Sequence, residues 1–333
     1  MTDRFQTLDE VYKRADAVGL IVDEFKLDGD WHRVPVVGKK KQNLSGAYCL
    51  SELSLQSGRV AIVGMLYNWV NGIEERLTLD GVEGATAEEI AEAKRRAKAA
   101  AEKSKREKAQ LQAETAERAQ GIWDKLPDSG RSQYLQKKGV KAWGLRFSRG
   151  SVVVPARDIS GKISTLQFID PDGNKRFLTG GAKRGRFHLI GRLPPEGQPL
   201  LIGIAEGYAT AATLHEALSY SIAVAFDAGN IIAVAQAFRR AYPNMRIVIF
   251  SDHDRFNGYP QAFIKQSQAN DAVRHQIKRL QQIRPDVEIE IVADDDPRLK
   301  DNNKSHNAGV AAAILTAAAV RGDVIVPKFR EAV

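Results

Sequence analysis

The sequence has very little cysteine: Cys49 is the single one among 333 residues. One cysteine cannot form an intramolecular disulfide, and it cannot supply the several thiolates of a structural zinc site. We therefore expect a chain that holds no zinc.

Long apolar runs are also absent. No stretch approaches the roughly 18 consecutive apolar residues that a membrane helix needs, and the first residues lack the apolar core of a signal peptide. We therefore expect a cytoplasmic protein with no membrane partner. The phosphate-binding GxxxxGK[ST] motif of many nucleoside triphosphatases is missing as well.

Positive charge is in excess. The net charge is +8 and the pI is about 9.4, so a polyanion such as nucleic acid is a plausible partner. The cations concentrate at Lys39-Lys40-Lys41 and between residues 175 and 192, in stretches that contain glycine. This distribution favours grooves or loops over a uniformly charged helix face.

Length and pattern indicate more than one domain. Residues 8–18 read as a short amphipathic helix, and residues 31–72 as short strands separated by glycines. From 86 to 119 the chain is rich in Ala, Glu, Lys, Arg and Gln without Gly or Pro, which favours a long solvated helix. We assign 1–80 to a small β-rich module and 81–121 to a charged helical connector.

The rest of the chain shows two different sequence patterns. Residues 122–198 show three β-type runs, 151–155, 163–169 and 176–178, separated by turn signals at Gly161 and Gly173. Residues 199–333 alternate apolar strands with helical stretches, and this βαβ order predicts a mostly parallel sheet flanked by helices, hence an α/β fold class. The expected strands are 200–205, 222–226, 246–250, 287–292 and 324–326, and the expected helices are 209–218, 231–242, 261–283 and 308–320.

Acidic residues follow several of these strands. Glu206 comes directly after the first one, and Asp252 and Asp254, at i and i+2, come just after the strand that ends at 250. Counting Asp227 and the run 294–296, four strands would deliver acids to one edge of the sheet. Single acids after strands are commonly helix N-caps or turn residues, and we interpret Asp227 as a turn residue. Three clustered carboxylates would repel one another unless a cation lay between them, which favours a Mg²⁺ site, with Mn²⁺ as an alternative metal.

The run Glu206-Gly207-Tyr208-Ala209-Thr210-Ala211, EGYATA, resembles the signature of conjugative-plasmid and satellite-phage primases, and the whole pattern resembles the Toprim catalytic domain. The resemblance implies that Glu206, Asp252 and Asp254 are catalytic and hold magnesium. A third acidic motif of bacterial primases is similar to Lys300-Asp301-Asn302-Asn303, but its last acid is missing here. Asp301 and Asp296 are therefore additional metal candidates.

The resemblance extends upstream. Residues 151–191 look like the basic subdomain that lines the template and nucleotide groove of such primases, and 31–72 resemble the strands of their zinc module without its cysteines. Tyr48, Tyr67 and Trp69 could add base stacking to charge contacts in that module. The candidate nucleotide- or DNA-binding residues are Arg157, Lys175, Arg176, Lys183, Arg184, Arg186, Lys39, Lys40 and Lys41.

These resemblances imply a DNA primase of plasmid or phage replication that makes short RNA primers from ribonucleoside triphosphates on a single-stranded DNA template. Any replicative helicase that works with it would be a separate chain or a part of the protein that this sequence does not include. Two alternatives stay open: a Toprim nuclease, because the same acids serve phosphodiester cleavage, and a single-stranded-DNA-binding replication accessory with a degenerate metal site.

Overall fold

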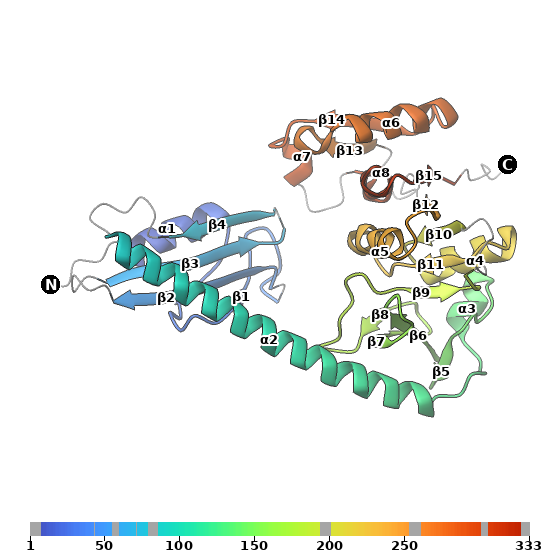
Figure 1. The fold of residues 1–333 in the computed structure, drawn as a ribbon, viewed down its shortest axis with the longest axis horizontal. Coiled ribbons are helices and arrows are strands. Elements are labelled where there is room, and N and C mark those ends of the chain that lie inside the picture. The colour runs from blue at the N-terminus through green and yellow to red at the C-terminus, as the bar shows by residue number, and fades with distance from the viewer. Residues whose placement is uncertain are drawn as a thin grey trace. The chain divides into compact units, whose positions relative to one another are not determined.

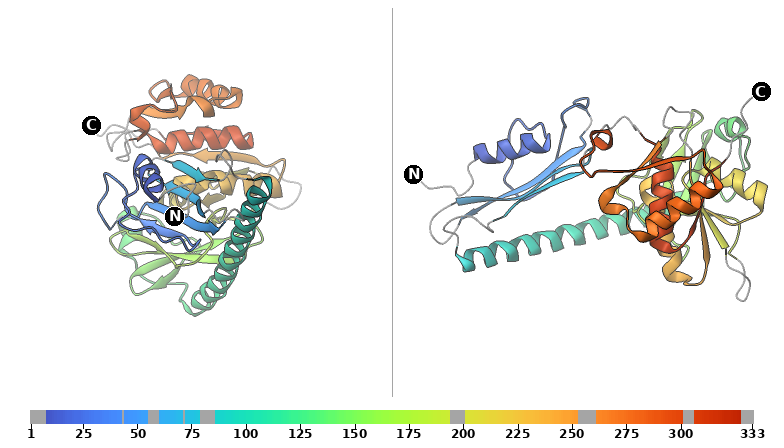
Figure 2. Two further views of the ribbon diagram at one scale, coloured as in Figure 1. Left: turned by 90° about the vertical axis from the view of Figure 1, so that its left-hand side faces the viewer. Right: turned by 90° about the horizontal axis from the view of Figure 1, so that it is seen from above.

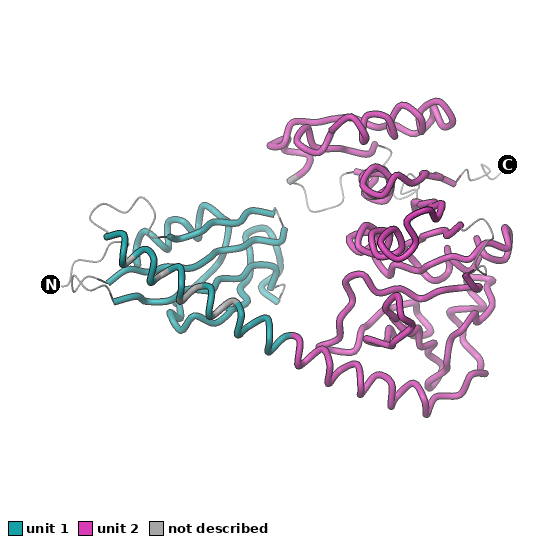
Figure 3. Tube along the Cα trace, in the orientation of Figure 1, with its two compact units in different colours: residues 1–108 teal, residues 109–333 magenta. Residues whose placement is uncertain are grey.

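The computed structural model describes residues 8–42, 44–54, 60–70, 72–78, 86–193, 201–252, 261–300 and 306–327. The chain divides into two compact units, Met1–Lys108 and Ala109–Val333 (Figure 3). The fold is mixed α/β, in agreement with the sequence. No helix among the described residues is long and apolar enough to cross a membrane.

The first unit is an antiparallel sheet with a helix on one face (Figure 1). Helix α1 (Leu8–Val18), which the sequence predicted, buries Val11, Ala15 and Val18 on that face. The strands lie in the order β1-β2-β3-β4, so each hydrogen-bonds to its neighbour in sequence. Their bounds are β1 (His32–Val34), β2 (Gly46–Ser54), β3 (Val60–Asn68) and β4 (Ile73–Leu77).

One side chain in this unit lies where the sequence did not suggest. Tyr48 was one of three aromatic residues considered for base stacking, but its position on β2 faces α1 and places the ring in the core, 2% exposed. Its hydroxyl accepts a hydrogen bond from the backbone N–H of Lys26 at 3.0 Å. Tyr67 and Trp69 lie on the opposite face, where their rings contact each other.

The long helix predicted over 86–119 is confirmed and is longer than expected: α2 spans Ala87–Lys125. Its last turns are held by packing, because Ala119 and Trp123 are buried against the apolar side of a second sheet. Arg146 then donates hydrogen bonds to the backbone carbonyls of Trp123 and Leu126, which satisfies acceptors at the helix end.

That second sheet is antiparallel, in the order β5-β6-β7-β8, and follows helix α3 (Gln133–Lys138). The turns fall at Gly161 and Gly173, as the sequence predicted, with φ of 88° and 89°, a region that glycine enters without strain. Asp158 and Asp170 brace these turns by accepting backbone N–H groups two and four residues later. The strand bounds are β5 (Arg146–Ser148), β6 (Ser151–Arg157), β7 (Ile163–Ile169) and β8 (Lys175–Phe177).

The central sheet has the order β15-β12-β10-β11-β9. β10 pairs in parallel with both β11 and β12, and β12 pairs in parallel with β15, whereas β9 is antiparallel to β11. The mostly parallel sheet predicted from the βαβ order is therefore present. The strand bounds are β9 (His188–Ile190), β10 (Leu201–Ala205), β11 (Ile222–Val224), β12 (Arg246–Phe250) and β15 (Asp323–Ile325).

Helices cover both faces of this sheet (Figure 2). Helix α4 (Tyr208–Leu218) packs on the face that carries Val248 and Phe250. Helices α5 (Ala228–Ala241) and α8 (Ala308–Val320) pack on the face that carries Ile247 and Ile249. A strand that is buried on both faces needs a continuous apolar run, which explains the sequence of β12.

The single helix predicted over 261–283 is wrong in its first half. Residues Gln261–Lys265 form strand β13, which pairs in parallel with β14 (Glu288–Val292) in a separate two-stranded sheet. Ala262, Phe263 and Ile264 are buried there, so tertiary packing overrides local helix preference. After a short 3₁₀ turn, η2 (Gln266–Gln268), helix α6 (Asp271–Ile283) begins at Asn270, whose side chain accepts the N–H of Val273. The short helix α7 (Pro297–Lys300) follows β14.

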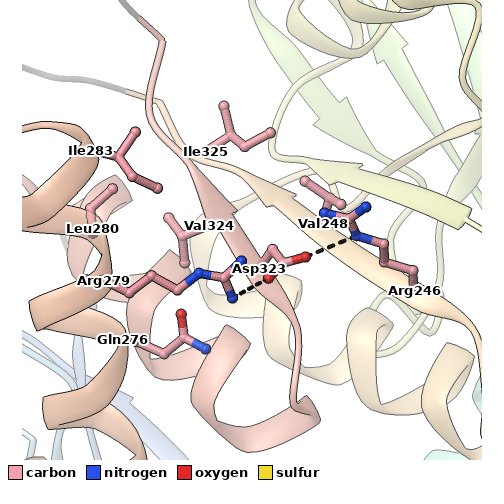
Figure 4. Close-up of a pocket in the computed structure, with 9 residues that line it drawn as sticks. All are labelled: Arg246, Val248, Gln276, Arg279, Leu280, Ile283, Asp323, Val324 and Ile325. Carbon is pink, nitrogen blue, oxygen red and sulfur yellow. Dashed lines mark hydrogen bonds and ion pairs between the residues drawn. The ribbon is translucent and has the colours of Figure 1, made fainter.

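An ion-pair bridge ties α6 to the central sheet. Asp323, the first residue of β15, pairs with Arg246 of β12 at 3.0 Å and with Arg279 of α6 at 2.5 Å (Figure 4). Gln276 adds a hydrogen bond from its side chain to the carbonyl of Gly322 at 2.9 Å. These contacts border a pocket of 180 Å³ at the amino ends of β12 and β15.

Asn230, in the first turn of α5, fastens the basic loop before β9 to the central sheet. Its side chain is 2% exposed. The amide oxygen accepts the N–H of Gly185 at 2.7 Å, and the amide nitrogen donates to the carbonyls of Arg186 and Ala225 at 3.0 and 2.8 Å. Three backbone groups of two segments thus depend on one side chain.

We predict that Asn230→Ala lowers the free energy of unfolding by roughly 3 kcal/mol, because it leaves buried backbone groups without partners. Urea unfolding followed by circular dichroism measures this loss. The matched control is Asn174→Ala in the exposed turn after β7, which should cost less than about 1 kcal/mol. Equal effects of the two substitutions would contradict the role of Asn230.

Candidate active site

Glu206 and Asp252 lie at the position in the sheet where ligands bind in open α/β folds. From β10 the chain passes through α4 to β11 on one side, whereas after β12 it leads to β15 on the other side. Neighbouring strands whose connections diverge leave a crevice at their carboxyl ends. Ala205 of β10 pairs with Phe250 of β12, so Glu206 comes one residue and Asp252 two residues after the ends of two adjacent strands.

A hydrogen bond links the two acidic segments. Thr210, in the first turn of α4, donates from its hydroxyl to Oδ1 of Asp252 at 3.5 Å. Gly207 forms the N-cap of α4 in extended conformation, so the chain turns sharply after Glu206. The EGYATA segment therefore supplies both an acid at one strand end and a donor to the acid at the other.

A cation approaches the same corner. A β-carbon added at Gly207 would lie 3.7 Å from Nζ of Lys175, so the ammonium group of this exposed β8 residue is close to the turn that carries Glu206.

Asp227, expected as a turn residue, is the N-cap of α5, and its carboxylate accepts the N–H of Asn230 at 3.0 Å. The Asp227 carboxylate also forms an ion pair with Lys183.

Helix α8 packs against the backbone of Asp252. A β-carbon at Gly309 would lie 2.6 Å from the backbone oxygen of Asp252, closer than such contacts occur. The first turn of α8 is therefore packed directly against the residue that carries the acid. Asn307, fully buried, caps this helix by accepting the N–H of Val310 at 3.3 Å.

The donor set at this edge suits a hard cation. Glu206 and Asp252 offer carboxylate oxygens from adjacent strand ends, and oxygen ligands are what Mg²⁺ prefers. The hydroxyl of Ser251, between Phe250 and Asp252, is buried without a hydrogen-bond partner among the described residues. Within the described ranges, which leave out 253–260 and 301–305, no three His, Cys, Asp or Glu side chains form a metal-binding group.

Two of the predicted site residues, Asp254 and Asp301, lie outside the described residues. The expectation that four strands bring acids to one edge was wrong, because β14 belongs to the separate β13–β14 sheet. Asp296, at its end, pairs with Arg298 at 2.8 Å, and the same guanidinium binds Glu290 at 2.8 Å. These hydrogen bonds hold the pKa values of both carboxyl groups below their usual range.

The predicted basic residues fall into two groups. Lys183 pairs with Asp227, Arg186 donates to the Ser164 hydroxyl at 2.7 Å, and Arg157 donates to the Gly161 carbonyl at 2.8 Å. Burial, and to a lesser extent the nearby Arg146, lowers the pKa of Arg157, which lines a pocket of 420 Å³. The other residues of the second unit are exposed: Lys175, Arg176 and Arg184.

Two residues beneath the site were not expected to matter. The Tyr208 ring of the EGYATA motif is 1% exposed, and its hydroxyl donates to the Lys141 carbonyl at 2.8 Å and accepts the Trp143 N–H at 2.7 Å. Burial raises the pKa of this phenol. Nε2 of the buried His188 bonds to the Trp143 carbonyl at 2.8 Å. The loop at 141–143 is thus fixed to the motif, a link for which the sequence carries no local signal.

No family model matches the chain. Relatives of the chain include proteins named DNA primase. Two proteins of Escherichia coli, both named DNA primase TraC, are 35% identical over 235 residues and 34% identical over 237 residues. Each alignment covers 69% of this chain but only 21% and 16% of the relatives, so the chain spans about a fifth or less of their length.

Similar solved structures include the primase fragment of the bacteriophage T7 primase-helicase protein, with 17% identity, 48% of this chain, 60% of that chain and a TM-score of 0.26. They also include the DnaG primase catalytic domain bound to ssDNA, with 19% identity, 37% and 43% coverage and a TM-score of 0.24. The strand order β15-β12-β10-β11-β9 of the central sheet defines the α/β fold.

We predict that Gly309→Ala displaces the Asp252 backbone and lowers the free energy of unfolding by about 1–3 kcal/mol. At the Mg²⁺ site that the sequence predicts, the same displacement should weaken Mg²⁺ binding several-fold. Isothermal titration with Mg²⁺ and urea unfolding measure the two effects. The control is Gly121→Ala in α2, where an added β-carbon meets nothing within 4 Å and helix propensity improves. Unchanged Mg²⁺ affinity in a folded Gly309→Ala protein would contradict the proposed packing role.

A second prediction concerns His188. Burial lowers its pKa to about 4 from an ordinary 6.5, so the folded state binds this proton less tightly than the unfolded state. Its contribution to stability is complete above pH 6.5 and falls by about 3 kcal/mol as the pH drops to 4. The free energies of unfolding of the wild type and of His188→Gln should therefore differ by about 3 kcal/mol less at pH 4 than above pH 6.5. A difference that stays constant over this pH range would contradict the lowered pKa of His188.

Proposed function

We propose that this chain is a Toprim-type DNA primase that synthesises short RNA primers on single-stranded DNA during plasmid or phage replication. The observation that supports this most is the pair Glu206 and Asp252 at the carboxyl ends of adjacent strands, at the diverging connections of the sheet. Its sequence similarity to part of two DNA primases supports the same function. It would act in the cytoplasm, with a separate helicase where one is needed.

The proposed metal is Mg²⁺, or Mn²⁺ in its place, held by Glu206, Asp252 and Asp254, with no zinc. Bound there, it would activate the primer 3′-hydroxyl and neutralise charge on the incoming triphosphate. Asp301 is a further candidate ligand. We leave Asp296 out of this set, because it follows β14 of the separate sheet and its carboxylate pairs with Arg298 of α7.

The chain's own residues would bind and orient the substrates. Lys175, which lies near the Glu206 turn, would contact the triphosphate, and the exposed Arg176 and Arg184 would contact backbone phosphates. Lys183 and Arg186 would act indirectly, because their contacts with Asp227 and Ser164 fix the loop that carries Arg184.

We predict that Glu206→Gln abolishes primer synthesis, by a factor of about 10³ or more, while single-stranded DNA binding stays within about twofold. The assay combines a single-stranded template, labelled ribonucleotides and Mg²⁺, and resolves the oligomers on a gel. The matched control is Asp295→Asn, which neutralises an exposed acid after β14, and it should retain full synthesis.

The same assay separates the alternatives. Retained synthesis by Glu206→Gln would contradict the assignment of the site. Shortened template without oligomers would identify a nuclease. Binding of template with neither product would identify a single-stranded-DNA-binding accessory protein.

A further inference from the structure

A pocket of 180 Å³ runs along β15, the edge strand of the central sheet. The pairing register sets Val248 opposite Asp323 and Phe250 opposite Ile325, so the side chains of Val248, Asp323 and Ile325 share the sheet face that carries α4. On that face α4 makes its main strand contacts with β9, β10 and β11. The strip over β12 and β15 therefore forms one side of the pocket.

Helix α6 forms the other side of the pocket. Leu280 and Ile283 of this helix lie between it and β15 (Figure 4). Ile283 is 64% exposed and Ile325 is 46% exposed, so solvent reaches an apolar rim. Together with Val248 and Val324, all the apolar residues that line the pocket are aliphatic. An apolar side chain from outside would remove this surface from water, which is favourable.

Two guanidinium groups stand at the charged end of the pocket. Arg246 and Arg279 each donate one hydrogen bond to the Asp323 carboxylate, from Nε at 3.0 Å and from Nη1 at 2.5 Å. The two arginine side chains are 65% and 48% exposed, and among the described residues no second acid pairs with either. A guanidinium has five N–H donors. The shared carboxylate thus holds both cations in place, leaves one positive charge uncompensated and leaves donors for another acceptor.

The exposed surface of α6 is also basic. Asp271 is the single acid of the helix, whereas Arg274 and Lys278 are exposed and form no ion pair with another described residue. An acidic ligand is therefore complementary in charge to this side of the pocket.

The size and lining of the pocket decide which acidic ligand it suits. Its volume lies below the range of about 300–1,000 Å³ of small-molecule sites, so it takes one side chain better than a whole nucleotide. No aromatic ring is among its described lining residues, so it offers no face on which a base could stack. A second copy of this chain would need about 800 Å² of buried surface on each partner, more than a rim of two exposed isoleucines supplies.

We propose that this pocket docks a short acidic segment of a partner protein. One apolar side chain of the segment inserts between Ile283 and Ile325, and the carboxylates beside it pair with Arg246 and Arg279. The pocket uses none of the residues of the acidic site, and docking needs neither metal, nucleotide nor template.

The test uses the full chain and a fluorescein-labelled peptide, Gly-Asp-Asp-Leu-Asp-Asp-Gly, at low ionic strength without Mg²⁺ or nucleic acid. Fluorescence anisotropy should give a Kd on the order of 100 µM. Serine in place of the peptide leucine should weaken binding about tenfold, because no apolar side chain then fills the pocket. Lysines in place of the aspartates should abolish binding, because like charges repel.

Variants of the protein assign the contacts. Ile283→Ser should weaken binding of the leucine peptide about tenfold, and Arg279→Gln about threefold. The matched controls are Leu218→Ser, at an apolar residue of α4 that is 41% exposed, and Arg106→Gln, at an exposed residue of α2, and both should bind normally. Ile283→Ser should bind the serine peptide as the wild type does, because the apolar contact is already absent.

Nuclear magnetic resonance locates the contact directly. In protein labelled at the isoleucine methyl groups, the leucine peptide should shift the signals of Ile283 and Ile325. The signal of Ile159, which is 39% exposed in the β6–β7 turn, should stay in place. Unchanged Ile283 and Ile325 signals at about 1 mM peptide would overturn the proposal.

Three other outcomes would also overturn it, and each identifies a different role for this surface. Equal affinity for the leucine and serine peptides would reduce the surface to a charge patch. Equal or tighter binding of an oligothymidylate, with shifts of the same methyl signals, would identify a nucleic-acid contact. Dimerisation that Ile283→Ser abolishes, measured by sedimentation, would identify an interface between copies of this chain. Glu206→Gln should bind the peptide as the wild type does, so failure of primer synthesis and failure of this site are distinguishable.

Discussion

The parallel pairing of β10 with β12 is the contact on which the candidate site depends. Five consecutive residue pairs, from Leu201 with Arg246 to Ala205 with Phe250, fix the register of the two strands. Because both strands run in the same direction, the residues just after each strand emerge at the same edge of the sheet. A slip of one residue would exchange Val248 and Phe250 with Ile247 and Ile249 between the two helix layers, and the close packing of each layer around its own side chains opposes that exchange. The position of two acids is therefore set by the hydrophobic core.

Around this pair, polar contacts connect segments that apolar packing alone would leave loosely positioned. Asn230 joins the basic loop to the sheet, Tyr208 joins the EGYATA motif to residues 141–143, and Gly309 allows α8 to approach Asp252 closely. Each of these three contacts is made by a residue that is buried or sterically restricted. The segments that it joins are therefore held in one geometry. The β5–β8 sheet and the central sheet share one apolar core, in which Val152 and Val154 pack with Ile222 and Phe250. The hydrogen bonds of Asn230 and Tyr208 to backbone groups fix the loops around that core.

The elements that could be predicted from sequence are those whose pattern of apolar residues lies within one segment of the chain. Helices 8–18 and 308–320 and strand 246–250 carry their periodicity within one segment, and their bounds were predicted correctly. Strand β13 was missed because its Gln-Ala-Phe-Ile-Lys run shows no strand preference strong enough by itself; its pairing with β14 decides its structure. The acid at 296 follows a strand as expected, but membership of a sheet is a long-range property, and β14 belongs to a different one. Glu206 and Asp252 were located because the positions after apolar strands could be read without knowing the sheet order.

The same distinction applies to charge, where sequence counts cations but burial decides which are available. Lys183, Arg186 and Arg157 have hydrogen-bond partners within the protein, whereas Lys175, Arg176 and Arg184 are exposed. In the first unit the alternation of a strand makes an equivalent division among aromatic residues. Tyr48 faces α1 and is buried, whereas Tyr67, one pairing row away on β3, faces the other side beside Trp69. A basic chain with many aromatic and cationic side chains therefore presents only a subset of them to a polyanion, and the pleat of a strand and the packing of a loop determine which ones.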